Sequence, residues 1–137
     1  MISYEDYIGP HTEAPTEPMI GNATILLSRV NALLAACEFK TTVASGWRPP
    51  LYNAELRRLW VESNGTKGAN TAVHSKHMTM QAIDIKDNDN QQIAKFLNEN
   101  KQILQDHGLW MEHPASTRGW CHLQSIGPKS GNRVFYP

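Results

Sequence analysis

The chain of 137 residues has little of several features that would define a function class directly. Its two cysteines, Cys37 and Cys121, are too few for the disulfide framework of a small secreted domain. Thirteen basic residues balance thirteen acidic ones, so the chain lacks the positive field that non-specific nucleic-acid binding requires. It also lacks an apolar run of membrane-spanning length and a signal peptide's basic start and apolar core. We therefore expect a protein made in the cytoplasm, with no nucleic-acid partner and no membrane insertion.

Both cysteines are expected to be buried free thiols. Cys37 ends a helical apolar stripe, and Cys121 precedes His122 in a β-prone segment. Because side chains alternate along a strand, Cys121 should face away from His122. A place for Cys121 among the ligands of a metal is the minor alternative.

The length predicts one domain with a real core, which we place at residues 22–137. Residues 1–21 show no periodicity and contain Pro10, Pro15 and Pro18, which favour extended backbone. We interpret this segment as an extended arm that lies over the domain. Three large side chains would anchor the arm: Tyr4, Tyr7 and Ile8.

Helical and strand periodicities alternate along the remaining chain. Apolar spacing predicts helices at about 22–37, 51–62 and 88–107, the last with a break at 98–100. β-branched or alternating segments predict strands at 41–45, 82–85, 109–112, 120–124 and 133–136. The expected class is therefore α+β, with a mainly antiparallel sheet and helices packed on it. The glycine- and asparagine-containing segment 64–73 should be a mobile loop, which either closes over a site or only connects elements.

The residues that carry chemistry are concentrated near two of the predicted strands. His77 precedes Asp84 by seven positions, and Asp84 lies between two isoleucines, where a buried carboxylate needs a metal ion or a basic side chain as its partner. His122 lies in another strand. Two neutral imidazoles and one carboxylate fill three tetrahedral positions of zinc and leave the fourth for water. We therefore predict one Zn²⁺ bound by His77, Asp84 and His122.

Two neighbouring residues leave alternatives open. His74 could chelate a metal together with His77 if the segment were helical, but the strand that follows favours His77, and we assign His74 a supporting or structural role. Arg48 follows a predicted strand and is placed to reach into a cleft. Its alternative is a surface arginine stacked on Trp47.

Three sequence blocks resemble the LAS metallopeptidases: Ser45-Gly46-Trp47-Arg48-Pro49, Ser75-x-His77-x-x-Met80-x-Ala82-x-Asp84 and Trp120-x-His122-Leu123-Gln124. That family includes D-Ala-D-Ala carboxypeptidases and dipeptidases, and the L-alanyl-D-glutamate endopeptidases of phage endolysins. The resemblance covers about residues 22–137, with the blocks in the family's order, and is strongest to small phage or prophage members. It implies the fold shared with the hedgehog signalling domain and one zinc ion on His77, Asp84 and His122. It also implies that Arg48 binds or polarises the peptide substrate and that Ser75 supports the site.

The chain departs from the family pattern at two positions. Many members carry glycine where this chain has Met80, which should alter packing beside the metal more than its coordination. Many also place an acidic residue three positions before the last histidine ligand, where this chain has Gly119. The nearest carboxylate that could act as general base is Glu112, and its alternative is an ordinary residue at a strand end.

Four further residues are candidates for binding substrate or supporting the site: Ser75, Gln81, His113 and Trp120. His113 would orient the substrate or donate to a developing oxyanion, and its alternative is an exposed loop histidine.

The function expected from these residues and the resemblance is a zinc-dependent peptidoglycan peptidase, an endolysin-like enzyme acting on stem peptides as a monomer. It would reach the cell wall after holin-type release or as a virion component. The alternative is a non-catalytic cell-wall or protein-binding module with a structural or vestigial zinc site, which the glycine at position 119 permits.

Overall fold

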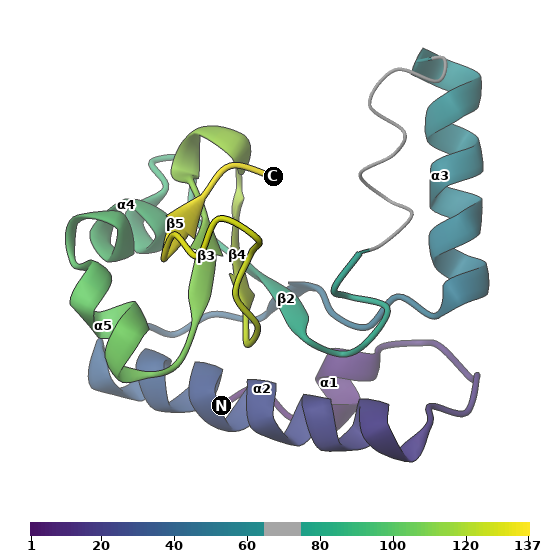
Figure 1. Cartoon of the computed structure of the whole chain (residues 1–137), viewed down its shortest axis with the longest axis horizontal. Coiled ribbons are helices and arrows are strands. Elements are labelled where there is room, and N and C mark those ends of the chain that lie inside the picture. Colours follow the sequence, from purple (N-terminus) through teal and green to yellow (C-terminus); the bar gives the residue numbers. More distant parts are fainter. Residues whose placement is uncertain (65–74) are drawn as a thin grey trace.

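A computed structural model describes residues 1–64 and 75–137 (Figure 1). Its helices are α1 (Tyr4–Ile8), α2 (Glu17–Ala36), α3 (Pro50–Asn64), α4 (Gln92–Glu99) and α5 (Lys101–Asp106), with a short 3-10 helix η2 (Pro114–Ser116). Its strands are β1 (Val43–Ser45), β2 (Ala82–Lys86), β3 (Trp110–Glu112), β4 (Trp120–Gln124) and β5 (Val134–Phe135). The α+β class is therefore confirmed. His74 and the part of the predicted loop after Asn64 lie outside the described residues.

The five strands form one sheet in the order β1-β2-β4-β3-β5. Neighbouring strands are antiparallel along the sheet except at one edge, where β5 pairs with β3 in parallel. The sheet is thus mixed, and the expectation of a mainly antiparallel sheet is correct for three of the four strand pairs. The parallel pair forms because the chain leaves β4 through a glycine-containing turn and returns along the far side of β3.

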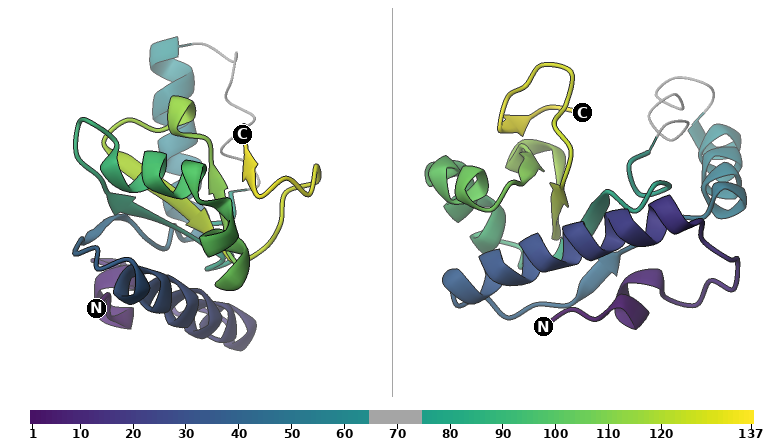
Figure 2. Two further views of the ribbon diagram at one scale, coloured as in Figure 1. Left: turned by 90° about the vertical axis from the view of Figure 1, so that its left-hand side faces the viewer. Right: turned by 60° about the horizontal axis from the view of Figure 1, so that its bottom comes forward.

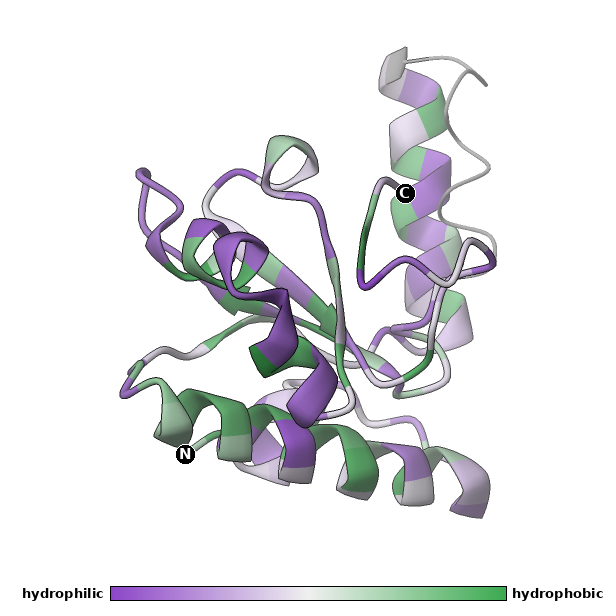
Figure 3. Cartoon of the chain, turned by 60° about the vertical axis from the view of Figure 1, so that its left-hand side comes forward, coloured by the Kyte–Doolittle hydropathy of each residue, from purple (hydrophilic) through white to green (hydrophobic). Residues whose placement is uncertain are grey.

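The two faces of the central strands differ in chemistry, because side chains alternate along each strand. One face carries residues with no exposed surface, which join the main core with side chains of α2, α4 and α5: Ile83, Ile85, Cys121 and Leu123. α2 lies along the sheet on this side, and Figure 3 shows the hydrophobic stretches of the helix. The opposite face carries Asp84 and His122, so the predicted metal ligands emerge where the helical layer is absent.

The predicted extended arm is wrong for much of residues 1–21. Ser3 caps α1 by accepting a hydrogen bond from the backbone of Asp6, and α2 begins at Glu17 with Thr16 as its cap. The prolines misled the prediction, because proline in the first turn of a helix is favourable and Pro18 occupies that position. The expected anchor is confirmed for Tyr7, which is buried in the core.

α2 has the length and mean hydropathy of a membrane-spanning segment, although polar residues interrupt its apolar sequence. The core helix of a soluble protein meets the same two criteria. In this chain six residues of α2 are buried against the rest of the protein: Ala23, Leu26, Leu27, Val30, Leu33 and Leu34.

α3 stands apart from the sheet, as Figures 1 and 2 show. Its bounds agree with the predicted helix at 51–62. Two of its apolar side chains, Leu51 and Leu59, are exposed rather than packed on the core.

The cysteines are free, as predicted. Cys121 is fully buried and faces away from the metal ligands, with its Sγ 3.5 Å from Sδ of Met111. Cys37 is only partly buried, because it caps the C-terminal end of α2 rather than continuing its buried face.

Met80 combines an unusual backbone conformation with a buried side chain. Its backbone has a φ of 59°, in the left-handed region that favours glycine, yet its side chain is fully buried in the core. The residue therefore combines an unfavourable backbone conformation with favourable packing directly before β2.

We predict that Met80→Gly destabilises the protein by about 2 kcal/mol, because losing the buried side chain costs more than relief of the backbone strain returns. Met80→Ala is the matched control, since it loses the same packing but keeps the unfavourable φ. Urea denaturation should find Met80→Ala less stable than Met80→Gly by about 1 kcal/mol. An alanine variant more stable than the glycine variant would contradict the strain at this position.

Candidate metal centre

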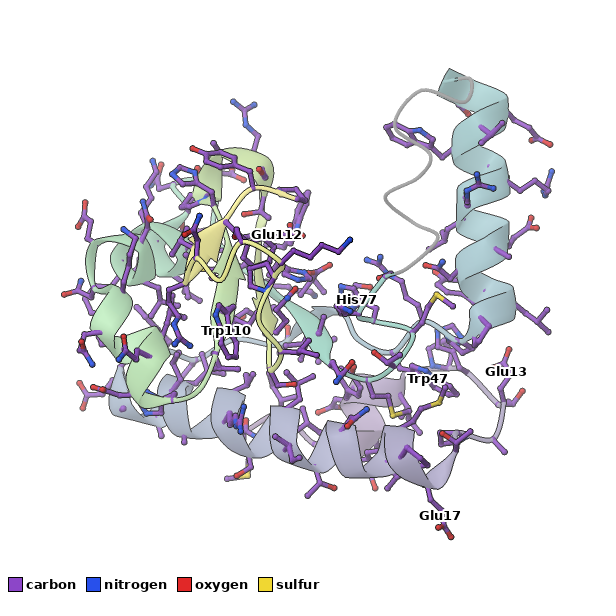
Figure 4. All side chains as sticks on the ribbon, in the orientation of Figure 1. Glu13, Glu17, Trp47, His77, Trp110 and Glu112 are labelled. Carbon is purple, nitrogen blue, oxygen red and sulfur yellow. The ribbon has the colours of Figure 1, made fainter. Side chains whose placement is uncertain are left out.

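The register of two strands brings the predicted carboxylate and imidazole together. Asp84 in β2 is the direct cross-strand partner of His122 in β4, so both side chains project from the same face of the sheet. His77, labelled in Figure 4, comes from the turn that precedes β2, and its Nε2 reaches the carboxylate of Asp84. The three predicted ligands, far apart along the chain, therefore meet at one place.

The ligand atoms lie close enough to share one ion. Nδ1 of His122 is 2.8 Å from Oδ1 of Asp84, and Nε2 of His77 is 3.4 Å from Oδ2 of the same carboxylate. One ligand atom from each residue lies within 4.8 Å of the others, and all three side chains are buried. Two imidazole nitrogens and a carboxylate oxygen suit a divalent transition metal, so the residues present fit the ion predicted from the sequence.

A backbone contact determines which nitrogen His77 offers. Nδ1 of His77 is 2.8 Å from the carbonyl oxygen of Gly46, which can only accept a hydrogen bond. Nδ1 must therefore carry the proton, and the lone pair of Nε2 faces Asp84. A histidine oriented in this way is ready to bind a metal through Nε2.

The N-terminal segment supports the loop that supplies this carbonyl. A Cβ atom on Gly46 would lie 1.9 Å from the carbonyl oxygen of Tyr7, so only glycine fits here without movement of the backbone. The same oxygen of Tyr7 accepts a hydrogen bond from the backbone of Trp47, and the Tyr7 hydroxyl donates to the carbonyl of Ala82 at 2.8 Å. Burial raises the pKa of this hydroxyl, so Tyr7 stays neutral. The N-terminal segment therefore supports the candidate metal centre through Tyr7.

The charges of the metal-free cluster follow from burial and hydrogen bonding. Burial alone would raise the pKa of Asp84, but its contacts with His122 and His77 outweigh burial and hold that pKa below its ordinary range. Burial lowers the pKa of His77, which favours its neutral form. Burial would also lower the pKa of His122, but its hydrogen bond to Asp84 and the nearby charge of Glu112 raise it instead. Without a metal, Asp84 and His122 thus form a buried ion pair.

Arg48 lies at the same carboxylate. Its Nη2 is 3.3 Å from Oδ2 of Asp84, and its Nε donates to the Ser45 hydroxyl at 3.1 Å. The backbone N–H of Arg48 donates to the carbonyl of His77, which ties the two residues together. The structure therefore brings Arg48 to the cluster and gives the carboxylate the basic partner named as the alternative to a metal. An arginine contact and metal ligation are compatible, because a carboxylate has two oxygens with two acceptor sites each.

Glu112 also reaches the cluster. It ends β3, next to β4 in the sheet, and its Oε1 is 3.8 Å from Nε2 of His122. Burial raises the pKa of this carboxyl above its ordinary value. Gly119 has a φ of 85° in the turn before β4. A side chain there would be strained, and Glu112 is the carboxylate that the fold places near the ligands.

These residues line one cleft with a volume of about 470 Å³. The predicted Ser75 and Trp120 are among its walls, and the Ser75 hydroxyl accepts a hydrogen bond from the backbone of His77 at 3.2 Å. Sequence reasoning assigned no role in the site to five other residues of the cleft: Lys76, Gln124, Pro128, Phe135 and Pro137. For Gln124 a signal was available, because a residue two positions after His122 in a strand shares its face.

Two predicted site residues do not line the cleft. Gln81 precedes β2, and its side chain accepts a hydrogen bond from the Thr79 hydroxyl at 2.7 Å. His113 accepts a hydrogen bond from the backbone of Ala115 and thereby caps η2, and its ring stacks on Tyr136. The structure therefore places both side chains outside the cleft, and the substrate-binding or supporting role expected of them stays a prediction.

No protein-family model matches the chain, and neither a curated protein nor a solved structure matches it.

The first prediction from this site concerns Gly46. Gly46→Ala should lower the free energy of unfolding by about 2 kcal/mol, because its Cβ would overlap the backbone of Tyr7. It should also weaken metal binding, because the carbonyl that orients His77 must move. Chemical denaturation and metal titration measure the two effects. Gly21→Ala is the control, since its Cβ would meet no atom within 4 Å and alanine favours the α2 helix. Equal behaviour of the two variants would contradict the close approach.

Glu112 should make the stability of the protein depend on pH. Because its pKa is raised on folding, the folded protein binds a proton more readily than the unfolded chain, and stability falls as pH rises through that range. Glu112→Gln should therefore raise the Tm of the metal-free protein at pH 7. The gain should vanish below about pH 4, where the glutamate is protonated in both states. Thermal unfolding with a chelator tests this, with Glu99→Gln as an exposed control. A variant less stable than wild type at pH 7 would contradict the burial cost.

Proposed function

We propose that this protein is a zinc-dependent peptidase that hydrolyses an amide bond in peptidoglycan stem peptides, as phage endolysins do. The observation that carries the proposal is the meeting of His77, Asp84 and His122 in a cleft that Arg48 and Glu112 also line. Two imidazoles and one carboxylate leave a coordination position for water, which distinguishes catalytic from structural zinc sites. The sequence blocks that resemble LAS metallopeptidases contain the same three residues.

In the proposed reaction, the substrate and water are activated by the ion, and Glu112 transfers the proton. Bound zinc would polarise the scissile carbonyl and make a water molecule more acidic. Glu112 then takes a proton from the attacking water and transfers it to the leaving nitrogen as the C–N bond breaks. Its position near the ligands and its raised pKa support this role, because burial brings the pKa of a carboxyl closer to neutrality.

Arg48 supplies positive charge to the same cleft. In the proposed reaction it stabilises the negative charge that develops on the carbonyl oxygen, or binds a carboxylate of the substrate. The contacts of Arg48 to Ser45 and Asp84 support a fixed orientation of its guanidinium. Stem peptides carry free carboxylates beside their D-centres, and the exposed Lys76 adds a second cation to the wall of the cleft. These charges favour an anionic peptide as substrate.

A non-catalytic cell-wall or protein-binding module is the competing function, and Gly119 is the observation that favours it. The effects of a chelator and of Glu112→Gln on hydrolysis distinguish the two functions. In a binding module, loss of the metal would leave no hydrolysis to abolish, and Glu112 would have no effect on the products.

We expect the purified protein to clear peptidoglycan in a zymogram and to lose this activity with a chelator. Asp84→Ala should lose both bound zinc and activity, because it removes the carboxylate ligand that both histidines contact. Glu112→Gln should keep zinc and lose at least about 100-fold in turnover, as expected for a general acid–base residue. Glu99→Gln, an exposed change of the same kind, should match wild type.

Mass spectrometry of fragments from defined muropeptides would identify the bond that is cut. A folded, zinc-loaded protein that releases no fragments would contradict the enzymatic proposal and favour the binding module. Full turnover in Glu112→Gln would be consistent with an enzyme but would contradict the role of Glu112 as its general base.

A further inference from the structure

Gln124 occupies a position in the metal centre that the reaction proposed above does not use. It lies at the end of β4, two residues after His122, so its side chain leaves the same face of the sheet. The side chain is buried at 5% exposure and lines the cleft. Its Oε1 is 2.9 Å from Nε2 of His122, and its Nε2 donates to the carbonyl of Ile126 at 2.7 Å.

The contact with Ile126 determines which way the amide points. If the amide were reversed, Oε1 of Gln124 would face the carbonyl oxygen of Ile126 at 2.7 Å, and two acceptors would repel each other. Oε1 therefore faces His122. Because this oxygen can only accept a hydrogen bond, Nε2 of His122 must carry a proton.

The proton on Nε2 leaves Nδ1 as the nitrogen that can bind a metal. Nδ1 lies 2.8 Å from Oδ1 of Asp84, on the side where His77 presents its Nε2. We propose that Gln124 is a positioning residue that holds His122 in the tautomer and ring orientation that present Nδ1 to the metal. This inference rests on the metal centre of the proposed function.

The two histidines differ in how they are oriented, and this difference makes the inference testable. His77 is oriented by the backbone carbonyl of Gly46, which no side-chain substitution removes directly. His122 is oriented by a side-chain oxygen, which a single substitution removes while the metal ligands all remain. Removal of a partner that orients a ligand histidine typically weakens metal binding about 10–100-fold.

Zinc affinity, measured by competition with a chromophoric chelator, tests the role without reference to activity. Gln124→Leu keeps the approximate size of the side chain but has no acceptor, and its Kd for zinc should rise about 10–100-fold. Gln124→Glu keeps an oxygen beside Nε2 of His122 and should bind zinc more tightly than Gln124→Leu. Gln105→Leu is the matched control, because Gln105 is exposed on α5 and does not line the cleft, and its Kd should equal that of wild type. Equal affinities of wild type and Gln124→Leu would overturn the role.

A measurement on the wild-type protein covers the case in which Gln124→Leu does not fold. The ¹⁵N chemical shifts of the His122 ring in the zinc-loaded protein should report a protonated Nε2 and a metal-bound Nδ1. The reverse assignment would overturn the inference. If wild type binds no zinc at all, the proposed zinc site itself is contradicted. If wild type binds zinc and Gln124→Leu binds it equally well, only the role of Gln124 fails.

Discussion

The cross-strand pair of Asp84 and His122 is the interaction on which the rest of the site depends. It exists because β2 and β4 pair in a register that places these two residues directly opposite each other. A shift of one residue in either strand would move its partner to the core face, where Ile83 and Leu123 now pack. The hydrophobic core therefore determines the metal centre, because the burial of one face of the sheet specifies the register that assembles the ligands on the other.

The surrounding chain reduces the freedom of each ligand. His77 is held by the carbonyl of Gly46, and Gly46 is held in turn by the backbone of Tyr7 in the first helix. His122 is held by Gln124, which is anchored on the carbonyl of Ile126. A buried cluster of one carboxylate and two imidazoles is costly without a compensating charge. The contacts of Asp84 with His122 and Arg48 supply that charge in the metal-free protein, and a divalent ion would supply more of it.

Sequence reasoning predicted the parts of this arrangement that depend on local pattern. The alternation of apolar and polar residues gave β2 and β4 nearly to the residue, and the chemistry of His77, Asp84 and His122 gave a ligand set that the structure brings together. It failed where tertiary contacts determine the backbone conformation or the direction of a side chain. Pro18 fits both an extended arm and the first turn of a helix, and only packing of α2 on the core favours the helix. Gln81 and His113 lie close to ligands or base in sequence, but their hydrogen bonds with Thr79 and Ala115 hold their side chains outside the cleft. Gln124 was missed although its spacing from His122 puts both side chains on one face of β4; the hydrogen bond between them is what spacing does not reveal.

The most direct test of the account is anomalous diffraction at the zinc absorption edge from crystals of the protein grown with zinc. We predict a single strong peak about 2.0–2.2 Å from Nε2 of His77, a carboxylate oxygen of Asp84 and Nδ1 of His122. A map with no peak at this cluster, or with zinc bound only by other residues, would contradict the account.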